Sequence, residues 1–452
     1  MATEAYLLLF VITAVLLVLT WLVWLRTRSV GFVVGMGLLY YWSIYGAWEL
    51  VGSLAHGSKS ARYEYLFAKM FGVELGPDYA IALIYYGLFL ITVALAVLVV
   101  AGAQNKSARN TLQIEVSQWR LLAMGFGGLV IAVWVIRDQL VEAIALGISG
   151  YAVTAAGSEI SSLFTIHQTF NSLSVLPPAI GVPLLFTGRD GRFVVAGRNP
   201  LITALYVVFV GILFIYGMIM GNKSELFFGA VASIVFYTLN TRRLRWGRLV
   251  LAGVLLLSLL GVVDYARTLA VSDLTTGLKS GRAVSAIGDV AKSNEAFASH
   301  FSMYGVLHYK VPLTWGTSVA SLVASAVPRL FWPNRPGTVY EHYAGYLGMA
   351  EGQGYTLHHA TGWYLNFGLF GILIGGMVLG GLWGILYRGF DGFGNSTSAS
   401  KLAYAAVAFA FFTGGIPNLV RVGLEGYKTI VIFTLIAPIL VLRFCRVRGG
   451  SS

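Results

Sequence analysis

The sequence predicts an all-α polytopic membrane protein with about eleven transmembrane helices. Only 11% of its 452 residues are charged and 57% are hydrophobic, whereas soluble domains carry roughly 25% charged residues. Apolar runs recur at about 20 residues, the length that crosses a bilayer as a helix. The ten-residue alternation typical of membrane β-barrels is absent, and helices are the other fold that satisfies its backbone in lipid.

The expected membrane segments belong to one integral membrane domain that occupies residues 1–452. They are residues 5–25, 31–51, 79–101, 120–137, 168–187, 201–220, 225–240, 248–263, 363–387, 402–418 and 428–443. Glycines at 31 and 35, and at 371, 375, 380 and 384, have the spacing that lets membrane helices approach closely, so we interpret them as packing residues.

The distribution of charge predicts the orientation. With the N-terminus outside, the inside loops and their flanks hold seventeen basic and three acidic residues, and the rest of the chain has fourteen basic and sixteen acidic residues. This positive-inside bias puts the C-terminus in the cytoplasm. It also explains the net charge of +12, so no nucleic-acid partner is expected.

Neither a removable leader nor a disulfide is expected from the sequence. The first apolar segment lacks a basic leader region and a small-residue cleavage site, so we expect it to be retained as a helix. The only cysteine, Cys445, falls in the inside tail, so no disulfide is expected.

A large outer loop, residues 265–362, is the segment expected to carry the functional site, because long loops often carry function. Within it, the apolar run 313–327 lies between Pro312 and Pro328. At 15 residues it is short for a span, so we expect an interfacial or re-entrant helix at the membrane face.

Basic residues on the outer side are not explained by orientation. They are Lys223, Arg267, Arg282, Arg329, Arg335 and Arg421. Any one of them is explained by a solvated or snorkelling side chain. Together they predict a diphosphate site at the outer leaflet, because arginine binds phosphate with two parallel hydrogen bonds and keeps its charge.

The stretch PRLFWPNRP, residues 328–336, holds two of these arginines between three prolines. Proline fixes φ and prevents a regular helix, so the guanidinium groups would be held in place to stabilise a departing anion. Phe331 and Trp332 are either part of a lipid or sugar site or anchors at the membrane interface.

A proton acceptor is expected if a hydroxyl group attacks the donor. The outer candidates are His300, His308, His342, His358, His359, Glu341 and Glu351. We favour His359 and His358, which open the ninth span, and then Glu341, because histidine titrates near neutral pH. The alternative is a structural role, which is the usual one for a single histidine.

Several chemistries find no support in the sequence. A DxD triplet, an HExxH motif, a P-loop and a GxSxG elbow are all missing. The His358–His359 pair lacks a third ligand at helical spacing. We therefore expect no metal site and no cofactor.

The segment from about 220 to 430 resembles bacterial oligosaccharide repeat-unit polymerases of the Wzy, or O-antigen polymerase, type. The resemblance rests on GNKSEL at the head of a span, the large outer loop, PRLFWPNRP, GWYLNFGLFGILIGGMVLGGL and a late outer arginine. Lys223, Arg329, Arg335 and Arg421 match motif positions, with Arg335 where the family often has lysine. Arg267 and Arg282 are added from charge placement.

The resemblance implies a GT-C-like, metal-independent glycosyltransferase in the bacterial inner membrane, with its site facing the periplasm. Its substrates would be undecaprenyl-diphosphate-linked oligosaccharides, with undecaprenyl diphosphate as the leaving group. It also implies membrane lipid, a chain-length regulator and a flippase as partners. In the related O-antigen ligases a histidine precedes a leucine-containing span; here the spacing from His359 to Leu365 is longer.

Two other functions are consistent with parts of the sequence. An O-antigen ligase would use the same donor with a lipid A-core acceptor. A flippase for a lipid-linked sugar predicts inverted repeats and ionisable residues near the membrane centre. No repeat is apparent, and Glu49 is the one acid clearly inside a predicted span.

Overall fold

The structure of the chain is a computed structural model, and the residues that it describes are almost entirely helical. They are residues 2–55, 76–102, 114–138, 140–141, 161–187, 193–196, 199–220, 223–241, 247, 250–251, 253–255, 258, 296–324, 332, 338–347, 356–391 and 399–447. The chain divides into two compact units. The first unit contains Met1–Asn105, Asn294–Arg388 and Ile416–Ile430, and the second contains Lys106–Ser293, Gly389–Gly415 and Val431–Ser452.

Eight described helices are long and apolar enough to cross a membrane. They are Thr3–Thr27, Val30–Gly52, Asp78–Val100, Gln118–Val135, Ile166–Phe186, Pro200–Gly217, His359–Gly389 and Leu402–Lys428. Each coincides with a segment expected from the sequence, so the chain has the character of a polytopic α-helical membrane protein. Two more expected segments are present as shorter apolar helices, Ser224–Asn240 and Val431–Cys445. The segment 248–263 lies largely outside the described residues.

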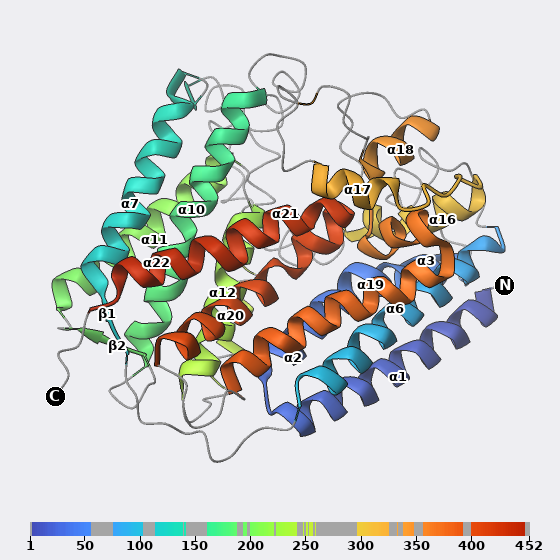
Figure 1. The fold of residues 1–452 in the computed structure, drawn as a ribbon, viewed down its shortest axis with the longest axis horizontal. Helices are drawn as coiled ribbons and strands as arrows, with labels where there is room; N and C mark the ends of the chain where they lie inside the picture. Colours follow the sequence, from blue (N-terminus) through green and yellow to red (C-terminus); the bar gives the residue numbers. More distant parts are fainter. Residues whose placement is uncertain are drawn as a thin grey trace. The chain divides into compact units, whose positions relative to one another are not determined.

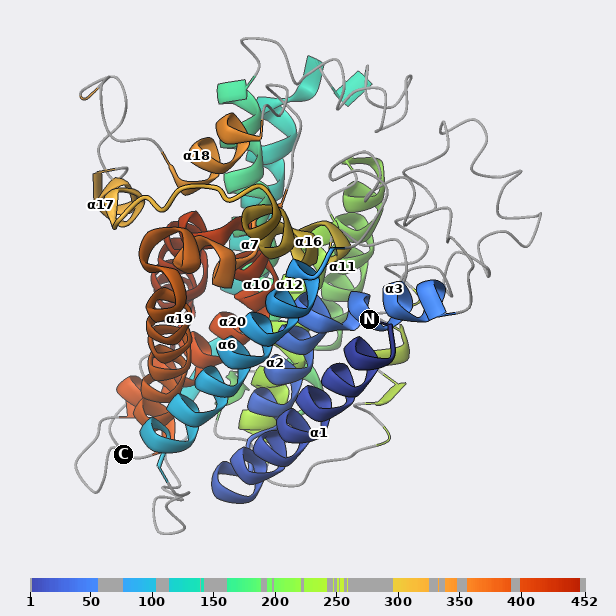
Figure 2. The same cartoon turned by 90° about the vertical axis from the view of Figure 1, so that its right-hand side faces the viewer.

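The first unit is built on helices α1 (Ala2–Thr27), α2 (Val30–Tyr40), α3 (Gly46–Ala55), α6 (Asp78–Val100) and the part of α19 (His359–Asp391) that ends at Arg388. Helices α1, α6 and α19 lie side by side (Figures 1 and 2). Between α2 and α3 the helix widens into the π-turn η1 (Tyr41–Tyr45), whose residues Trp42, Ser43 and Ile44 are buried. Helix and turn continue without a break, so one long element carries Ser43 to the interior of the unit.

Small residues let α19 approach α6 closely. A Cβ atom at Gly380 would collide with the backbone carbonyl of Val93, and one at Gly384 would lie 2.9 Å from Cβ of Val100. At Gly35 in α2, a Cβ would collide with the ring of Trp383. The interpretation as glycines that let helices approach is confirmed for Gly35, Gly380 and Gly384, whereas Gly371 and Gly375 face Trp363 of α19 itself.

Helix α19 breaks in its N-terminal part, which the sequence did not predict. Phe367 (φ −141°, ψ 20°) and Gly368 (φ 59°, ψ −141°) leave the helical region, and a positive φ of this kind favours glycine. The break frees the carbonyl of Leu365, which accepts hydrogen bonds from the Thr314 backbone N–H at 2.7 Å and from Thr314 Oγ1 at 3.2 Å. The loop before α17 is thereby fixed to the broken turn.

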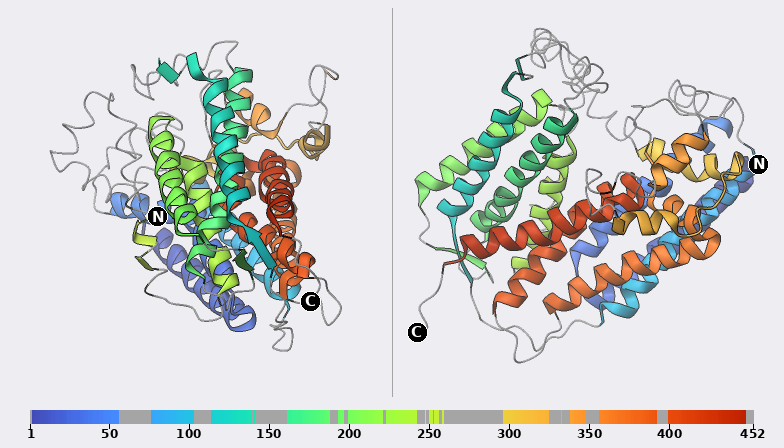
Figure 3. Two further views of the ribbon diagram at one scale, coloured as in Figure 1. Left: turned by 90° about the vertical axis from the view of Figure 1, so that its left-hand side faces the viewer. Right: turned by 45° about the horizontal axis from the view of Figure 1, so that its top comes forward.

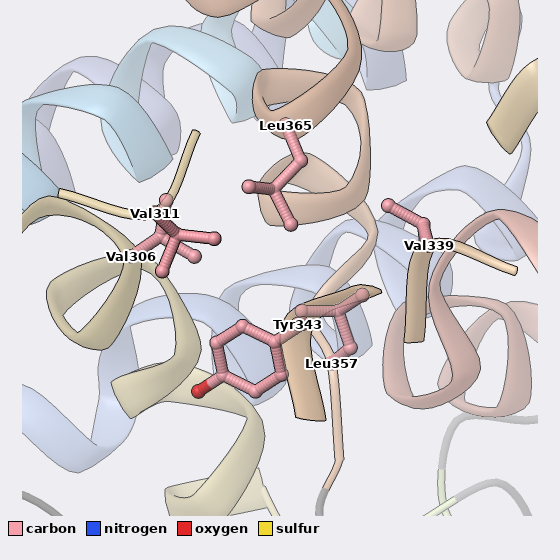
Figure 4. Packing of buried hydrophobic residues seen from close by; sticks show 6 residues of the cluster. All are labelled: Val306, Val311, Val339, Tyr343, Leu357 and Leu365. Atoms are coloured by element: carbon pink, nitrogen blue, oxygen red, sulfur yellow. The ribbon is translucent and has the colours of Figure 1, made fainter. Parts of the chain in front are cut away.

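Three described helices lie in the expected outer loop: α16 (Ala296–His308), α17 (Thr317–Ala324) and α18 (Val339–Tyr346). They pack with the start of α19 through a buried cluster of Val306, Val311, Val339, Tyr343, Leu357 and Leu365. The side chains of this cluster point toward one another (Figure 4). The outer loop is therefore a packed part of the first unit over these residues.

Helix α17, inside the run expected to be interfacial, has inverted amphipathicity. Its buried face carries Ser318 and Ser321, and Ser318 Oγ donates to Oδ1 of Asn366 at 2.7 Å. On the other side Val323 is 75% exposed, and the preceding Trp315 is 76% exposed. A helix with polar residues inside and apolar residues outside suits a lipid environment, and its interfacial or re-entrant placement stays a prediction.

The second unit contains α7 (Gln118–Val135), α10 (Ser161–Phe186), α11 (Pro200–Met220), α12 (Lys223–Asn240) and α22 (Ala437–Cys445). Helices α7, α10 and α11 pack against one another (Figure 3). Gly414, in the part of α20 (Ala399–Val422) that belongs to this unit, approaches α12 so closely that a Cβ would lie 2.7 Å from the carbonyl oxygen of Phe228.

Two short strands join the loops of the second unit, although the sequence indicated helices alone. Strand β1 (Ile114–Ser117) pairs in parallel with β2 (Phe193–Ala196), with Ile114 opposite Phe193. Four residues are too few for strand alternation to stand out in a sequence. Asn240 at the end of α12 stabilises the pairing, since its Oδ1 accepts the N–H of Phe193 at 2.7 Å.

Candidate functional site

His358 lies at the centre of a buried hydrogen-bond network in the first unit. Its Nδ1 accepts the backbone N–H of Ala360 at 3.0 Å, and its Nε2 lies 2.8 Å from Oγ of Ser43 in the π-turn. Because Nδ1 is an acceptor, the neutral ring carries its proton on Nε2 and donates it to Ser43. A base that activates Ser43 would accept the serine proton on Nε2, whereas this ring donates its own proton from Nε2 to the serine.

The surroundings of His358 favour its neutral form. The residue has no exposed surface, and burial, together with the nearby rings of His359 and His300, holds its pKa well below the usual value. A neutral ring that donates to Ser43 and accepts from Ala360 has used both of its nitrogen atoms.

His359, the first residue of α19, is also fully buried. Its Nδ1 lies 3.1 Å from the carbonyl oxygen of Gly423, to which it donates, so Nε2 carries the lone pair. The indole N–H of Trp363 donates to Nε2 at 3.0 Å, and the hydroxyl of Tyr427 lies 3.1 Å from the same atom. The ring thus joins the start of α19 to the turn that follows Arg421.

His300 of α16 is the third buried histidine of this network, and it was one of several outer histidines considered from the sequence. Its Nδ1 donates to the carbonyl oxygen of Ser43 at 2.7 Å, and its Nε2 accepts from the hydroxyl of Tyr79 at 2.8 Å. Burial lowers the pKa of His300 from 6.5 to about 4. Ser43 therefore bonds to two histidines, to one through its side chain and to the other through its backbone.

Tyr86 of α6 ties the same elements together. Its hydroxyl lies 2.7 Å from the carbonyl oxygen of His300, to which it donates, and it accepts the N–H of Met303 at 3.2 Å. Ser302 Oγ accepts the N–H of His358 at 3.0 Å and lies 2.9 Å from Oγ1 of Thr361. These bonds fix the approach to α19 before its first turn.

The turn after Arg421 holds the second part of the site. Arg421 is partly buried in the last turn of α20, and the chain continues into the 3-10 turn η4 (Gly423–Glu425) and α21 (Gly426–Ile430). Glu425 Oε1 accepts the N–H of Val339, the first residue of α18, at 3.0 Å. The other carboxylate oxygen, Oε2, is buried and has no hydrogen-bond partner among the described residues.

Thr338 and Glu341 form a capping box at the same end of α18. The Thr338 side chain accepts the N–H of Glu341 at 3.1 Å, and Glu341 Oε2 accepts the N–H of Thr338 at 2.9 Å. This arrangement satisfies two backbone donors that a helix start otherwise leaves open. Glu341, expected from the sequence as a catalytic candidate, is exposed and occupied in this cap.

Two stretches singled out from the sequence, the histidine pair and the turn after Arg421, meet in this region of the first unit. The start of α18, which begins three residues beyond PRLFWPNRP, joins them there. Gly423 bonds to His359, and Glu425 bonds to Val339. A Cβ at Gly362 would lie 3.4 Å from Leu424 and 3.7 Å from Val339, so α19, η4 and α18 share one contact point.

Among the other basic residues expected at the site, Lys223 alone belongs to the described part of the chain. Lys223 is the first residue of α12 in the second unit. Arg267, Arg282, Arg329 and Arg335 lie outside the described residues, as do Glu351 and Phe331. Trp332 is described and is 44% exposed. Within the described part of the chain, no three histidine, cysteine, aspartate or glutamate side chains gather as metal ligands would.

Sequence reasoning missed Glu425 as a functional candidate. A single acid in the turn NLVRVGLEGY has no motif and no periodicity to mark it. One signal was available: Glu425 follows Arg421 by four residues. In a turn this short, both side chains are expected to stay close to the membrane.

Comparison of the chain with protein-family models, with curated proteins and with solved structures finds no match.

Proposed function

We propose that the protein polymerises undecaprenyl-diphosphate-linked oligosaccharide repeat units at the periplasmic face of the bacterial inner membrane. The growing chain would leave its lipid diphosphate and join a hydroxyl of the next lipid-linked unit. The proposed reaction uses no metal and no cofactor.

The observation that supports it best is the contact of the turn after Arg421 with the histidine pair and with the start of α18. The turn after Arg421 bonds both to His359 and to the residue three positions beyond PRLFWPNRP. Segments separated by more than 80 residues in the sequence thus share one place at the start of α19. In the proposed site, Arg421 and the arginines of PRLFWPNRP stabilise the departing diphosphate, since preorganised cations lower the energy of a developing anion.

The buried histidines have a supporting role in this proposal. The rings of His300 and His358 bond to η1 and the ring of His359 bonds to η4, so together they join η1, α16, α19 and η4. Segments that are joined by buried side chains favour positioning of two lipid-borne substrates. That His359 or His358 also accepts a proton stays a prediction.

The test uses a strain that lacks the chain and accumulates single lipid-linked units. Re-expression of the protein should restore a ladder of long polymers, whereas Arg329→Ala, Arg335→Ala and Arg421→Ala should reduce it while the variants still insert. Arg137→Ala serves as the matched control, because Arg137 is an exposed arginine that pairs with Asp138 outside the proposed site. Normal ladders in all three site variants would refute the proposal.

The purified protein distinguishes polymerase from ligase and flippase. With lipid-linked units as donor and acceptor, and with EDTA present, we expect elongation and release of polyprenyl diphosphate. Product with lipid A-core alone would instead identify a ligase. Movement of the lipid-linked unit across vesicles without bond formation would identify a flippase.

A further inference from the structure

We propose that Glu425 is the general base of this reaction: its Oε2 takes the proton from the acceptor hydroxyl. This inference rests on the proposed function and assigns to Glu425 the proton transfer for which the sequence favoured His359 and His358. The acceptor oxygen forms a bond to the anomeric carbon of the donor, and the bond from that carbon to the diphosphate oxygen breaks. The diphosphate leaves with the electron pair, and the proton moves to Glu425.

The first argument is the state of the two carboxylate oxygens. Oε1 is fixed by the N–H of Val339 at 3.0 Å, so the orientation of the carboxylate is set by the backbone of α18. Oε2 is enclosed and has no hydrogen-bond donor among the described residues. A buried acceptor without a donor is unfavourable, so the O–H of a substrate that reaches Oε2 supplies a bond which the protein itself does not.

The second argument is that the neighbouring candidates are already engaged. His358 donates to Ser43 and accepts from Ala360. His359 donates to Gly423 and accepts from Trp363. To remove a proton from a substrate, either ring would first have to break a buried hydrogen bond, whereas Oε2 of Glu425 has none to break among the described residues.

The third argument is position. Glu425 lies four residues after Arg421, and it bonds to the start of α18 three residues beyond PRLFWPNRP. The proton acceptor and Arg421, which is proposed to receive the leaving diphosphate, are therefore linked through one turn. The residue as a whole is partly exposed, unlike His358 and His359, so its turn borders the surface of the first unit.

The decisive variant is Glu425→Gln, because it separates the chemical role from the structural one. Glutamine has the same shape, and its amide oxygen still accepts the N–H of Val339, but it cannot accept a proton. Elongation of the lipid-linked units that accumulate in the deletion strain should fall by roughly 10²- to 10⁴-fold, the usual contribution of general-base catalysis. Asp78→Asn is the matched control: Asp78 is a partly exposed carboxylate beside His308 at the start of α6.

Azide provides the second measurement, since it attacks the anomeric carbon as an anion and has no proton to lose. With azide as the acceptor, wild type and Glu425→Gln should form the glycosyl azide and release polyprenyl diphosphate at rates within about threefold of each other. Arg421→Ala should lose this reaction as well, because it acts on the leaving group.

The outcomes separate the two proposals. Elongation by wild type together with elongation of at least one-third of that rate by Glu425→Gln would overturn the role of Glu425 alone. Parallel loss of elongation and azide transfer in Glu425→Gln would also overturn it, since the residue would then be structural. Failure of wild type to elongate or to release polyprenyl diphosphate under any condition would refute the proposed function, and the role of Glu425 with it.

Discussion

His359 illustrates how a residue chosen for chemistry can be required first for structure. Its ring bonds to Gly423, Trp363 and Tyr427 within a fully buried space. Its place at the head of a span was predictable, because GYTLHH directly precedes a long apolar run. Its partners were not, because contacts between residues 64 and 68 positions apart leave no trace in a single sequence.

We expect His359→Ala to destabilise the first unit strongly. The carbonyl of Gly423 and the indole N–H of Trp363 would lose their partners inside the protein, and each buried unpaired group costs about 1–3 kcal/mol. The midpoint of thermal unfolding in detergent should therefore fall clearly. His342→Ala is the control, since His342 makes one bond, to the carbonyl of Pro312 at 2.8 Å. Equal shifts in the two variants would contradict the network.

The buried histidines also predict a pH dependence of stability. The unfolded chain binds a proton at His300 near the ordinary pKa of 6.5, whereas the folded site binds it near 4. Between these values the unfolded state holds more protons, so the free energy of unfolding decreases by about 1.4 kcal/mol for each pH unit below 6.5. The loss levels off near pH 4, and above pH 6.5 this residue contributes no slope.

Thermal unfolding of the wild type and of His300→Gln across pH 4.5–7.5 measures this effect. Glutamine keeps a donor and an acceptor but does not titrate, so the variant should show a slope smaller by about one proton between pH 4.5 and 6. Parallel curves for the two proteins would show that His300 titrates normally in the folded state.

At the scale of the elements, length and apolarity were enough to predict eight of the long helices, because a bilayer selects for both. Deviations within the helices were not predictable. Gly368 reads as one more packing glycine in an apolar run, yet it has a positive φ at the break of α19. The π-turn that presents Ser43 likewise lies in an ordinary aromatic sequence, YWSIY. Both irregularities depend on tertiary hydrogen bonds made by distant segments.

The close approach of α6 and α19 gives a prediction with an internal control. Gly380→Leu should destabilise the protein by about 1–3 kcal/mol or more, as overpacking usually does, because its Cβ would collide with the backbone of Val93. Gly381, the next residue, has no atom within 4 Å of a built Cβ. Gly381→Leu should therefore leave the unfolding midpoint nearly unchanged. If both variants behave alike in thermal unfolding, the two helices do not meet through Gly380.

At the scale of the whole molecule, the number of crossings decides on which side of the membrane the chain ends. Eleven segments, as the sequence predicts, place the two termini on opposite sides, whereas eight would place them on the same side. The difference lies in the short helices Ser224–Asn240 and Val431–Cys445 and in residues 248–263. The charge pattern favours eleven, since Arg242, Arg243 and Arg245 lie between the segments 225–240 and 248–263, and Arg446 and Arg448 follow the last segment.

Two labels on the full-length protein test this parity. Green fluorescent protein fused after Ser452 should fluoresce, because this reporter folds in the cytoplasm. A cysteine placed at Ala2 should react in spheroplasts with a maleimide that cannot cross the membrane, while the native Cys445, which is buried, should not. Labelling at Ala2 only after the membrane is opened would place both ends inside. In that case an even number of segments crosses, and the outer positions of Arg421 and Glu425 would have to be assigned anew.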